Sequence, residues 1–429
     1  MSTNAGIDAG EPAQPGTPTF SVLTFNTHLF EGSNAVTGAM LSDFFAHDRT
    51  ALVHLDHQRL EELMRRVRAL PVAPDVICLQ EVWAPAMQAA AEKELRAFFG
   101  VDPKDPTHVF RPPYAGQQLP GAPDDLVGDL LKTFLANEIM HADDWDAAVR
   151  RLLRTYTNSS GLMVASRWPI GKPHFERYSG ASKQEDQLCE KGALVFEVEV
   201  PAGEGSVPVR MGVTHAYTRP AEALVNVRRL ADLTLKDWTG DALVLGDLNI
   251  HAYRLDADGV RSEYEGLRAA MCDERGAVDV IAGLAPGAYT DWPAGNRLNR
   301  VLVAQEEAWD EAVEVVGDPP RLTKMRLDPF GWIKVPDYVN YLKRTEAWTA
   351  RVAQEGAQHV PGKLDEILSD DFAPPTQGRE LIDYVFLRRG EQGPHLVPVS
   401  VEVFHDWTLE NRVDVSDHAP VLVTFEVAG

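Results

Sequence analysis

The chain has 429 residues, of which 44% are hydrophobic and 24% charged, and it carries a formal net charge of −23. This composition is typical of globular proteins with a large core and argues against extensive disorder. The acidic charge disfavours non-specific binding to nucleic acids, because it repels their phosphates. Keeping the protein in solution is the simplest explanation of the charge, which does not by itself exclude a nuclease.

Residues 1–19 are polar and lack the basic and apolar segments of a secretory signal, so we expect a flexible tail. No apolar run reaches the roughly 18 residues that a membrane-spanning helix needs. The three cysteines, Cys78, Cys189 and Cys272, are odd in number and lie far apart, which favours reduced thiols. We therefore expect a cytoplasmic protein, with secretion by another route left open.

Short strands and helices are predicted along the rest of the chain. Apolar or alternating runs predict strands at residues 21–26, 75–79, 161–166, 193–200, 207–214, 242–246, 381–388, 399–404 and 421–427. Apolar residues at helical spacing predict helices at residues 56–70, 86–99 and 221–238. The helices should cover the outer faces of the sheets.

We expect one domain over residues 20–429 with two insertions. The first, at about residues 124–154, has the pattern of one or two amphipathic helices. The second, at about residues 299–378, combines a helical pattern with the aromatic residues Trp309, Phe330, Trp332, Tyr338, Tyr341 and Trp348. A local core is the simpler interpretation of these aromatic residues, and a lid that faces substrate or a membrane is the alternative.

Polar residues follow several of the predicted strands. Asn26 ends one apolar run, and Glu81 follows another after Gln80. Taken alone, each is more often a loop or capping residue than a ligand. Magnesium accepts one or two protein carboxylates and keeps its waters, so Glu81 assisted by Asn26 is chemically sufficient to hold it.

The sequence Gly-Asp-Leu-Asn at residues 246–249 is the most specific local pattern. On an extended segment, alternation would put Asp247 and Asn249 on one face. A carboxylate there can position or deprotonate water, and an amide can hold a phosphoryl oxygen without adding charge. The same triplet also occurs in tight turns.

Two histidines come from separate strand ends. His418 follows Asp417 just before the last predicted strand, and Asp383 opens another strand. The Asp383 carboxylate could orient the His418 imidazole and raise its pKa, which would suit binding of an oxyanion. His215 offers a second hydrogen-bond donor.

These residues resemble the endonuclease/exonuclease/phosphatase superfamily, whose fold is that of deoxyribonuclease I. The similarity spans about Phe20 to Val427. The matching positions, in order, are Asn26, Gln80-Glu81, residues 166–170, Thr214-His215, residues 246–249, Ile382-Asp383 and residues 416–420. The resemblance implies an α+β fold, a four-layer α/β/β/α sandwich of two packed mixed β-sheets flanked by helices, with the active site at one end of the strands.

The resemblance also implies a role for each matching residue. The metal, Mg²⁺ with Mn²⁺ or Co²⁺ as alternatives, would be bound on the side of Asn26, Glu81, Asp247 and Asp417. The residues implied in catalysis are His215, Asp247, Asn249, Asp383 and His418. His215 and His418 would contact the phosphate, and the general base stays open between Asp247 and His418.

Within the superfamily, residues 23–30 and 189–195 are similar to the bacterial and neutral sphingomyelinase branch, where a Lys-Gly pair opens the strand before the His215 strand. This implies a metal-dependent phosphodiesterase acting on a sphingomyelin-like phospholipid, with peripheral membrane contact and nucleic acid a less favoured partner. A simple strand-initiating turn is an equal interpretation of Lys191-Gly192.

Three other functions are left open. A nuclease acting on DNA or RNA predicts a basic cluster beside the site, formed by Arg65, Arg66, Arg68, Arg111 and Arg167. A phosphatase would act on a soluble phosphomonoester. A catalytically silent interaction module would keep only the fold, and the intact matching positions argue against it.

Overall fold

The computed structural model describes residues 18–29, 55–83, 85–113, 159–181, 189–252, 262–317, 335–369, 372, 378–391 and 393–428. The predicted insertion at residues 124–154, most of the predicted N-terminal tail, and Phe330 and Trp332 lie outside these ranges.

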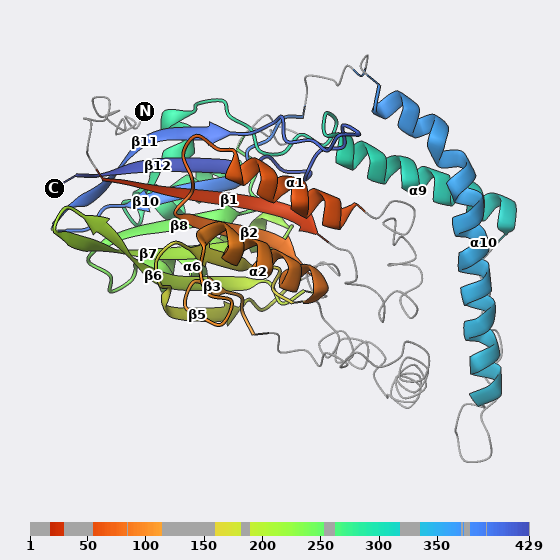
Figure 1. Cartoon of the computed structure of the whole chain (residues 1–429), viewed down its shortest axis with the longest axis horizontal. Coiled ribbons are helices and arrows are strands. Elements are labelled where there is room, and N and C mark those ends of the chain that lie inside the picture. The colour runs from red at the N-terminus through yellow and green to blue at the C-terminus, as the bar shows by residue number, and fades with distance from the viewer. Residues whose placement is uncertain are drawn as a thin grey trace.

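Two six-stranded sheets form the centre of the molecule (Figure 1). The first has the order β11-β12-β1-β2-β4-β3. Its strands are β1 (Thr19–Leu29), β2 (Val76–Val82), β3 (Val109–Phe110), β4 (Met163–Ser166), β11 (His395–Val403) and β12 (Val421–Ala428). The second has the order β5-β6-β7-β8-β10-β9. Its strands are β5 (Gly171–Arg177), β6 (Gly192–Ala202), β7 (Gly205–His215), β8 (Asp241–Asp247), β9 (Val278–Asp279) and β10 (Asp383–Arg388).

Alternating side chains along the strands separate the layers. On β1, Val22 belongs to the core between the sheets, whereas Leu23 and Phe25 pack with α1 (Asp56–Arg68) and α2 (Pro85–Phe99) on the outer face. On the second sheet, α6 (Pro220–Leu235) lies close enough that a Cβ at Gly212 would be 2.0 Å from Oγ1 of Thr234. The four-layer sandwich predicted from the sequence is thus confirmed.

Three shorter helical elements complete this side of the molecule: α7 (Ser262–Arg268), the π-helical turn η2 (Ala269–Asp273) and α8 (Val280–Leu284). They were not predicted. The predicted strands and helices all form, and their ends differ from the predicted ends by a few residues. β5 was not predicted either, because this edge strand is mostly polar and holds Pro173 beside a register shift. Edge positions and bulges are where a strand tolerates proline.

The segment predicted as the second insertion contains α9 (Arg297–Val316) and α10 (Val335–Ile367), which extend beyond the sandwich (Figure 1). The two helices pack closely, since a Cβ at Gly356 would lie 3.4 Å from the Ala308 carbonyl oxygen. Trp348 packs beside Ala312 and Val352 in this contact. Among the helices in the described ranges, none combines the length and the apolar character that a membrane span requires.

Candidate active site

Two parallel strand pairs converge on one end of the sandwich. Among the described strands, β1 with β2 and β7 with β8 are the parallel pairs. Near their carboxyl ends, the first pair carries Asn26 and Glu81 and the second carries His215 and Asp247. Because the two pairs belong to different sheets, the four side chains meet at the seam between the sheets.

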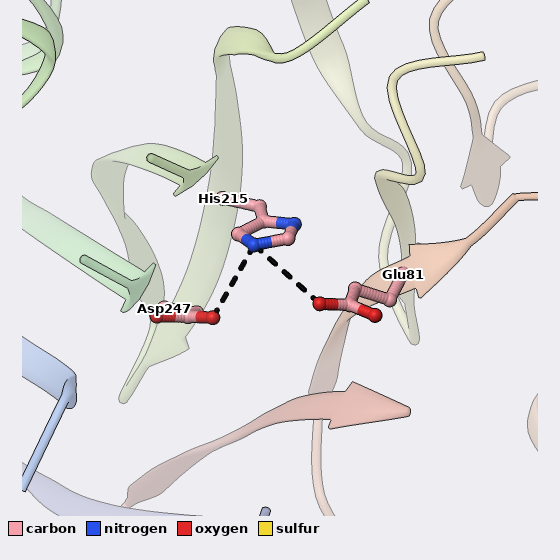
Figure 2. Close-up of side chains that lie close together, drawn as sticks. All are labelled: Glu81, His215 and Asp247. Atoms are coloured by element: carbon pink, nitrogen blue, oxygen red, sulfur yellow. Dashed lines mark ion pairs between the residues drawn. The ribbon is translucent and has the colours of Figure 1, made fainter. Parts of the chain in front are cut away.

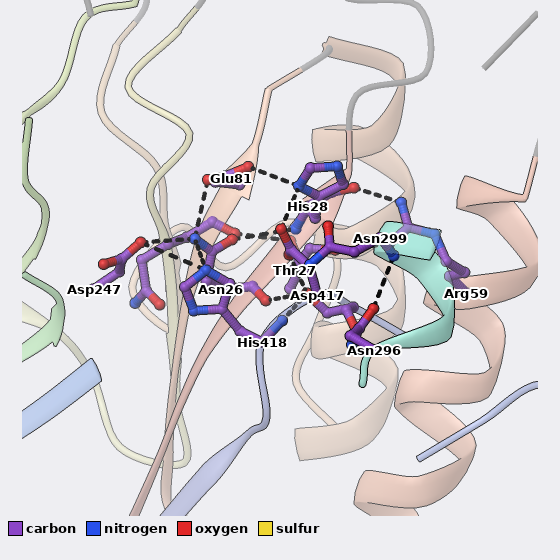
Figure 3. Close-up of polar contacts among 12 residues, drawn as sticks. Asn26, Thr27, His28, Arg59, Glu81, Asp247, Asn296, Asn299, Asp417 and His418 are labelled. Carbon is purple, nitrogen blue, oxygen red and sulfur yellow. Dashed lines mark hydrogen bonds and ion pairs between the residues drawn. The ribbon is translucent and has the colours of Figure 1, made fainter. Parts of the chain in front are cut away.

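The Asn26 amide lies between Glu81 and Asp247 (Figure 3). Its Nδ2 donates to Oε1 of Glu81 at 3.0 Å and to Oδ2 of Asp247 at 2.9 Å. Its Oδ1 accepts the His28 backbone N–H at 3.3 Å. The amide nitrogen, rather than the oxygen, thus faces the two carboxylates, and Asn26 holds them together across the seam.

His215 completes a compact set of metal-binding atoms (Figure 2). Its Nε2 lies 3.5 Å from Oε1 of Glu81 and 3.4 Å from Oδ2 of Asp247. One ligand atom from each of these three residues falls within 4.8 Å of the others. The two carboxylates supply the oxygen ligands that Mg²⁺ prefers, and an imidazole beside them suits the transition-metal alternatives, so the residues present fit the divalent cation that the resemblance implies. We had predicted His215 as a phosphate contact only.

The surroundings set the protonation of this cluster. Burial, and to a smaller extent the charge of Lys191, lowers the pKa of His215 well below its usual range. The imidazole is therefore neutral near pH 7. Burial raises the pKa of Asp247 to about 7, with the His418 charge opposing and the Asp383 carboxylate adding to the rise. Burial would also raise the pKa of Glu81, but its hydrogen bonds with His28 and Asn26 and the charge of His28 hold it well below its usual range.

Asp417 reaches this group through His28. Nδ1 of His28 lies 3.5 Å from Oε2 of Glu81 and 3.2 Å from Oδ2 of Asp417. Burial alone would lower the pKa of His28, but the two carboxylates outweigh burial and raise the pKa to about 10. Asp417 was predicted on the metal side; it lies outside the Glu81–His215–Asp247 cluster and is linked to Glu81 through His28, which pairs with both carboxylates.

Asp383 and His418 form a buried pair beside the cluster. Asp383 is the first residue of β10, where it pairs in register with Asp247. Its Oδ2 lies 2.8 Å from Nδ1 of His418. Although burial opposes it, the Asp383 carboxylate raises the pKa of His418 well above its usual range. Nε2 of His418 then faces Asn26 at 3.4 Å and Asp247 at 3.9 Å, on the side of the metal-binding atoms.

A turn, and not the predicted strand alternation, places Asn249 at the site. The strand ends at Asp247, so strand alternation does not place Asn249 beside it. Instead Asn249 has a left-handed backbone, and its N–H donates to Oδ1 of Asp247 at 2.9 Å. Its side-chain amide donates to the Ala216 carbonyl oxygen at 3.1 Å. The prediction from alternation was wrong, because an Asx-type turn forms here.

Left-handed backbone recurs at the site. His28, Glu81 and Asn249 have φ values of 50°, 58° and 51°. On β2, alternation would point Glu81 outward with Ile77 and Leu79, and the left-handed residue departs from that pattern. Such conformations cost free energy in residues other than glycine and cluster at functional sites, where the surrounding contacts maintain them.

Several residues at the site had no assigned role in the sequence analysis. Nζ of Lys191 lies 3.0 Å from Nε2 of His215 and donates to the Ala216 carbonyl oxygen at 3.1 Å. Nε1 of Trp83 donates to Oε2 of Glu81 at 3.4 Å. The Lys-Gly pair gave a signal for Lys191, whereas His28 appeared only within the resemblance to the sphingomyelinase branch and nothing in the pattern pointed to Trp83.

A model of the Endonuclease/Exonuclease/phosphatase family matches residues 23–418. The chain therefore belongs to this family, whose members are phosphoester hydrolases that use divalent metals. The match includes every residue of the site from Asn26 on β1 to His418.

Solved structures with a similar overall arrangement include SmcL, at 14% identity and a TM-score of 0.48 over 96% of this chain and all of that one. Sphingomyelinase C from Streptomyces griseocarneus has 16% identity and a TM-score of 0.39 over 95% of this chain and 99% of its own. A humanized D. rerio TDP2 has 12% identity and a TM-score of 0.44 over 95% and 99%. At these values the similarity does not discriminate between substrates.

One curated protein also matches in part. UDP-3-O-acyl-N-acetylglucosamine deacetylase from Thioalkalivibrio sulfidiphilus (strain HL-EbGR7) is 34% identical over 101 residues, which are 23% of this chain. The matched segment spans about a third of that protein's length, 31%. We draw no functional conclusion from it.

Proposed function

We propose that this chain is a Mg²⁺-dependent phosphodiesterase that hydrolyses a sphingomyelin-like phospholipid by attack of water at phosphorus. The observation that carries the proposal is the hydrogen bonding of Asn26 to both Glu81 and Asp247, with His215 within 3.5 Å of the same carboxylates. A phosphodiester bound there would meet the candidate metal ligands and the Asp383–His418 pair together.

We assign Glu81, Asp247 and His215 to hold the cation, with Asn26 fixing the two carboxylates and Asp417 acting through His28. A divalent cation bound among them would stabilise negative charge on the phosphate oxygens. His418, protonated near pH 7 because its pKa is raised, donates from Nε2 to a phosphoryl oxygen. This favours Asp247 over His418 as the general base, and Asn249 keeps its proposed role of holding the phosphate.

The sphingomyelin-like substrate is supported by the sequence resemblance at residues 23–30 and 189–195. The structure adds that Lys191 of that second segment contacts His215 at the centre of the site.

The distribution of basic residues disfavours a nuclease. All five arginines expected to form a basic cluster are paired with carboxylates: Arg65 and Arg66 with Glu62, Arg68 with Glu94, Arg111 with Glu92, and Arg167 with Asp75. Arg167 also directly follows β4, beside the start of β2 and away from the end of β2 that carries Glu81. These side chains therefore offer little uncompensated positive charge for a phosphate backbone.

The test is Mg²⁺-dependent hydrolysis of sphingomyelin vesicles, single- and double-stranded DNA and soluble phosphomonoesters by wild type, His418→Ala and His395→Ala. His395 is a matched control, because Nδ1 of His395 lies 3.1 Å from Asp241 at the other end of β8. Release of phosphocholine by wild type and His395→Ala, but not by His418→Ala, is the expected result. Cleavage confined to DNA or a monoester would overturn the substrate, and no turnover of any substrate would overturn the enzyme assignment.

A further inference from the structure

Thr290 contacts the main chain of both segments that carry the Asp383–His418 pair. It is 2% exposed and precedes Asp291, which forms isolated antiparallel bridges with both Glu380 and His418. The Thr290 carbonyl oxygen accepts the Ala419 N–H at 2.7 Å, and its own N–H donates to the Glu380 carbonyl oxygen at 2.9 Å. The main chain of Thr290 therefore joins the segment that leads into β10 to the loop that carries His418.

The Thr290 hydroxyl contacts the backbone of Asp383 directly. Its Oγ1 accepts the backbone N–H of Asp383 at 3.1 Å and that of Ile382 at 3.3 Å. In the second sheet, β9 pairs with β10 only at Phe386 and Leu387, so the described part of β9 does not reach the start of β10. A side-chain oxygen here does what a backbone carbonyl does in a sheet, and buried N–H groups require such an acceptor.

We propose that Thr290 is a positioning residue that sets Asp383 at hydrogen-bonding distance from His418. Its hydroxyl fixes the backbone of Asp383, while its carbonyl group fixes the residue after His418. The two ends of the 2.8 Å contact are therefore anchored on one residue. The effect on turnover rests on the proposed function, whereas the effect on the geometry of the pair does not.

The experiment compares Thr290→Val, which keeps the shape but removes the acceptor, with Thr290→Ser, which keeps the acceptor. Thr424→Val is the matched control, because Thr424 is 6% exposed on β12 and its hydroxyl has no hydrogen-bond partner in the described structure. Two readouts are taken: the downfield ¹H resonance of the His418 ring proton at Nδ1, assigned with His418→Gln, and kcat and KM on whichever substrate wild type hydrolyses.

We expect Thr290→Val to lose or shift the His418 proton resonance and to lower kcat by about ten- to a hundredfold, with KM changed less than about threefold. Thr290→Ser and Thr424→Val should keep the resonance, and their kcat should stay within about threefold of wild type. If wild type hydrolyses nothing, the proposed function fails, but the resonance still tests the positioning of the pair.

An unchanged resonance in folded Thr290→Val would overturn the inference, as would loss of the resonance in Thr290→Ser. Circular dichroism and thermal unfolding establish that each variant is folded. If Thr290→Val does not fold, Thr290→Ala replaces it in the comparison with serine. Failure of both acceptor-free variants to fold would assign Thr290 a general structural role and overturn the specific one.

Discussion

Arg59 holds the main chain on either side of the candidate site, and removing its guanidinium group should destabilise the whole domain. It lies on α1 with a side chain 3% exposed, and it pairs with Asp56, which is 5% exposed, at 2.5 Å. It also donates to the carbonyl oxygens of Thr27 at 3.0 Å and of Val415 at 2.9 Å, and to that of His28. The substitution Arg59→Met keeps the apolar stem and removes every one of these donors.

The expected loss follows from what stays buried. Asp56 would keep a buried carboxylate without its cation, and breaking a buried pair in this way costs about 3–5 kcal/mol. The buried carbonyl oxygens would also lose their donor. The free-energy cost of these unsatisfied acceptors is either included in that loss or adds to it. Since domains of this kind have free energies of unfolding of about 5–15 kcal/mol, the loss is a large fraction of the total.

Urea unfolding followed by circular dichroism measures this loss, with the m-value compared to establish that the unfolding transition is the same. The control is Arg68→Met on the same helix, because Arg68 is 44% exposed and its ion pair with Glu94 lies on the surface. We expect the control to change the free energy of unfolding by less than about 1 kcal/mol. A loss below about 1 kcal/mol in Arg59→Met would refute the reasoning that the buried donors stabilise this region.

Three further substitutions test other parts of the site. Glu81→Gln should lower Mg²⁺-dependent turnover about a hundredfold or more, and full activity with an unchanged Mg²⁺ titration would remove Glu81 from the ligand set. Lys191→Met should raise the pKa of His215, because the lysine charge and burial together lower this pKa and the substitution removes the charge. An NMR titration measures the shift, and an unchanged pKa would contradict the prediction. Burial raises the pKa of Asp414 to about 6 from 3.8, so wild-type stability should fall, by at most about 3 kcal/mol, as pH rises from about 4 through 6. Asp414→Asn should flatten that profile in urea unfolding at pH 4 to 8, and an unchanged slope would assign it to other groups.

The sequence predicted the strand ends of the site because apolar runs stop there. The runs before Asn26 and Asp247 are buried strands, and the polar residue after each had to lie at a sheet edge. The Asn26–Asp247 hydrogen bond joins residues 221 positions apart, and only the family resemblance could place them together. Strand alternation could not predict the direction of the Glu81 side chain, because this direction depends on a left-handed backbone.

Other contacts at the site correspond to no pattern in the sequence. Thr290 acts through backbone groups of residues 92 and 93 positions away, and a buried threonine before an aspartate looks like any turn. His28 bridges two carboxylates from other segments, a relation that spacing along the chain does not encode. Local patterns thus predict which elements form, whereas the neighbours of each side chain depend on how the sheets stack.

The division of the cluster between the two sheets has a consequence for how the protein responds to its ligand. Glu81 comes from one sheet, and His215 and Asp247 from the other, so neither sheet holds the full set of binding atoms. A ligand that contacts both halves ties the sheets to each other while it is bound. Its binding free energy then adds directly to the free energy of unfolding, in proportion to the logarithm of its concentration above Kd. A displacement of one sheet relative to the other would separate the two parts of the binding set, so ligand binding and the packing of the two sheets are coupled.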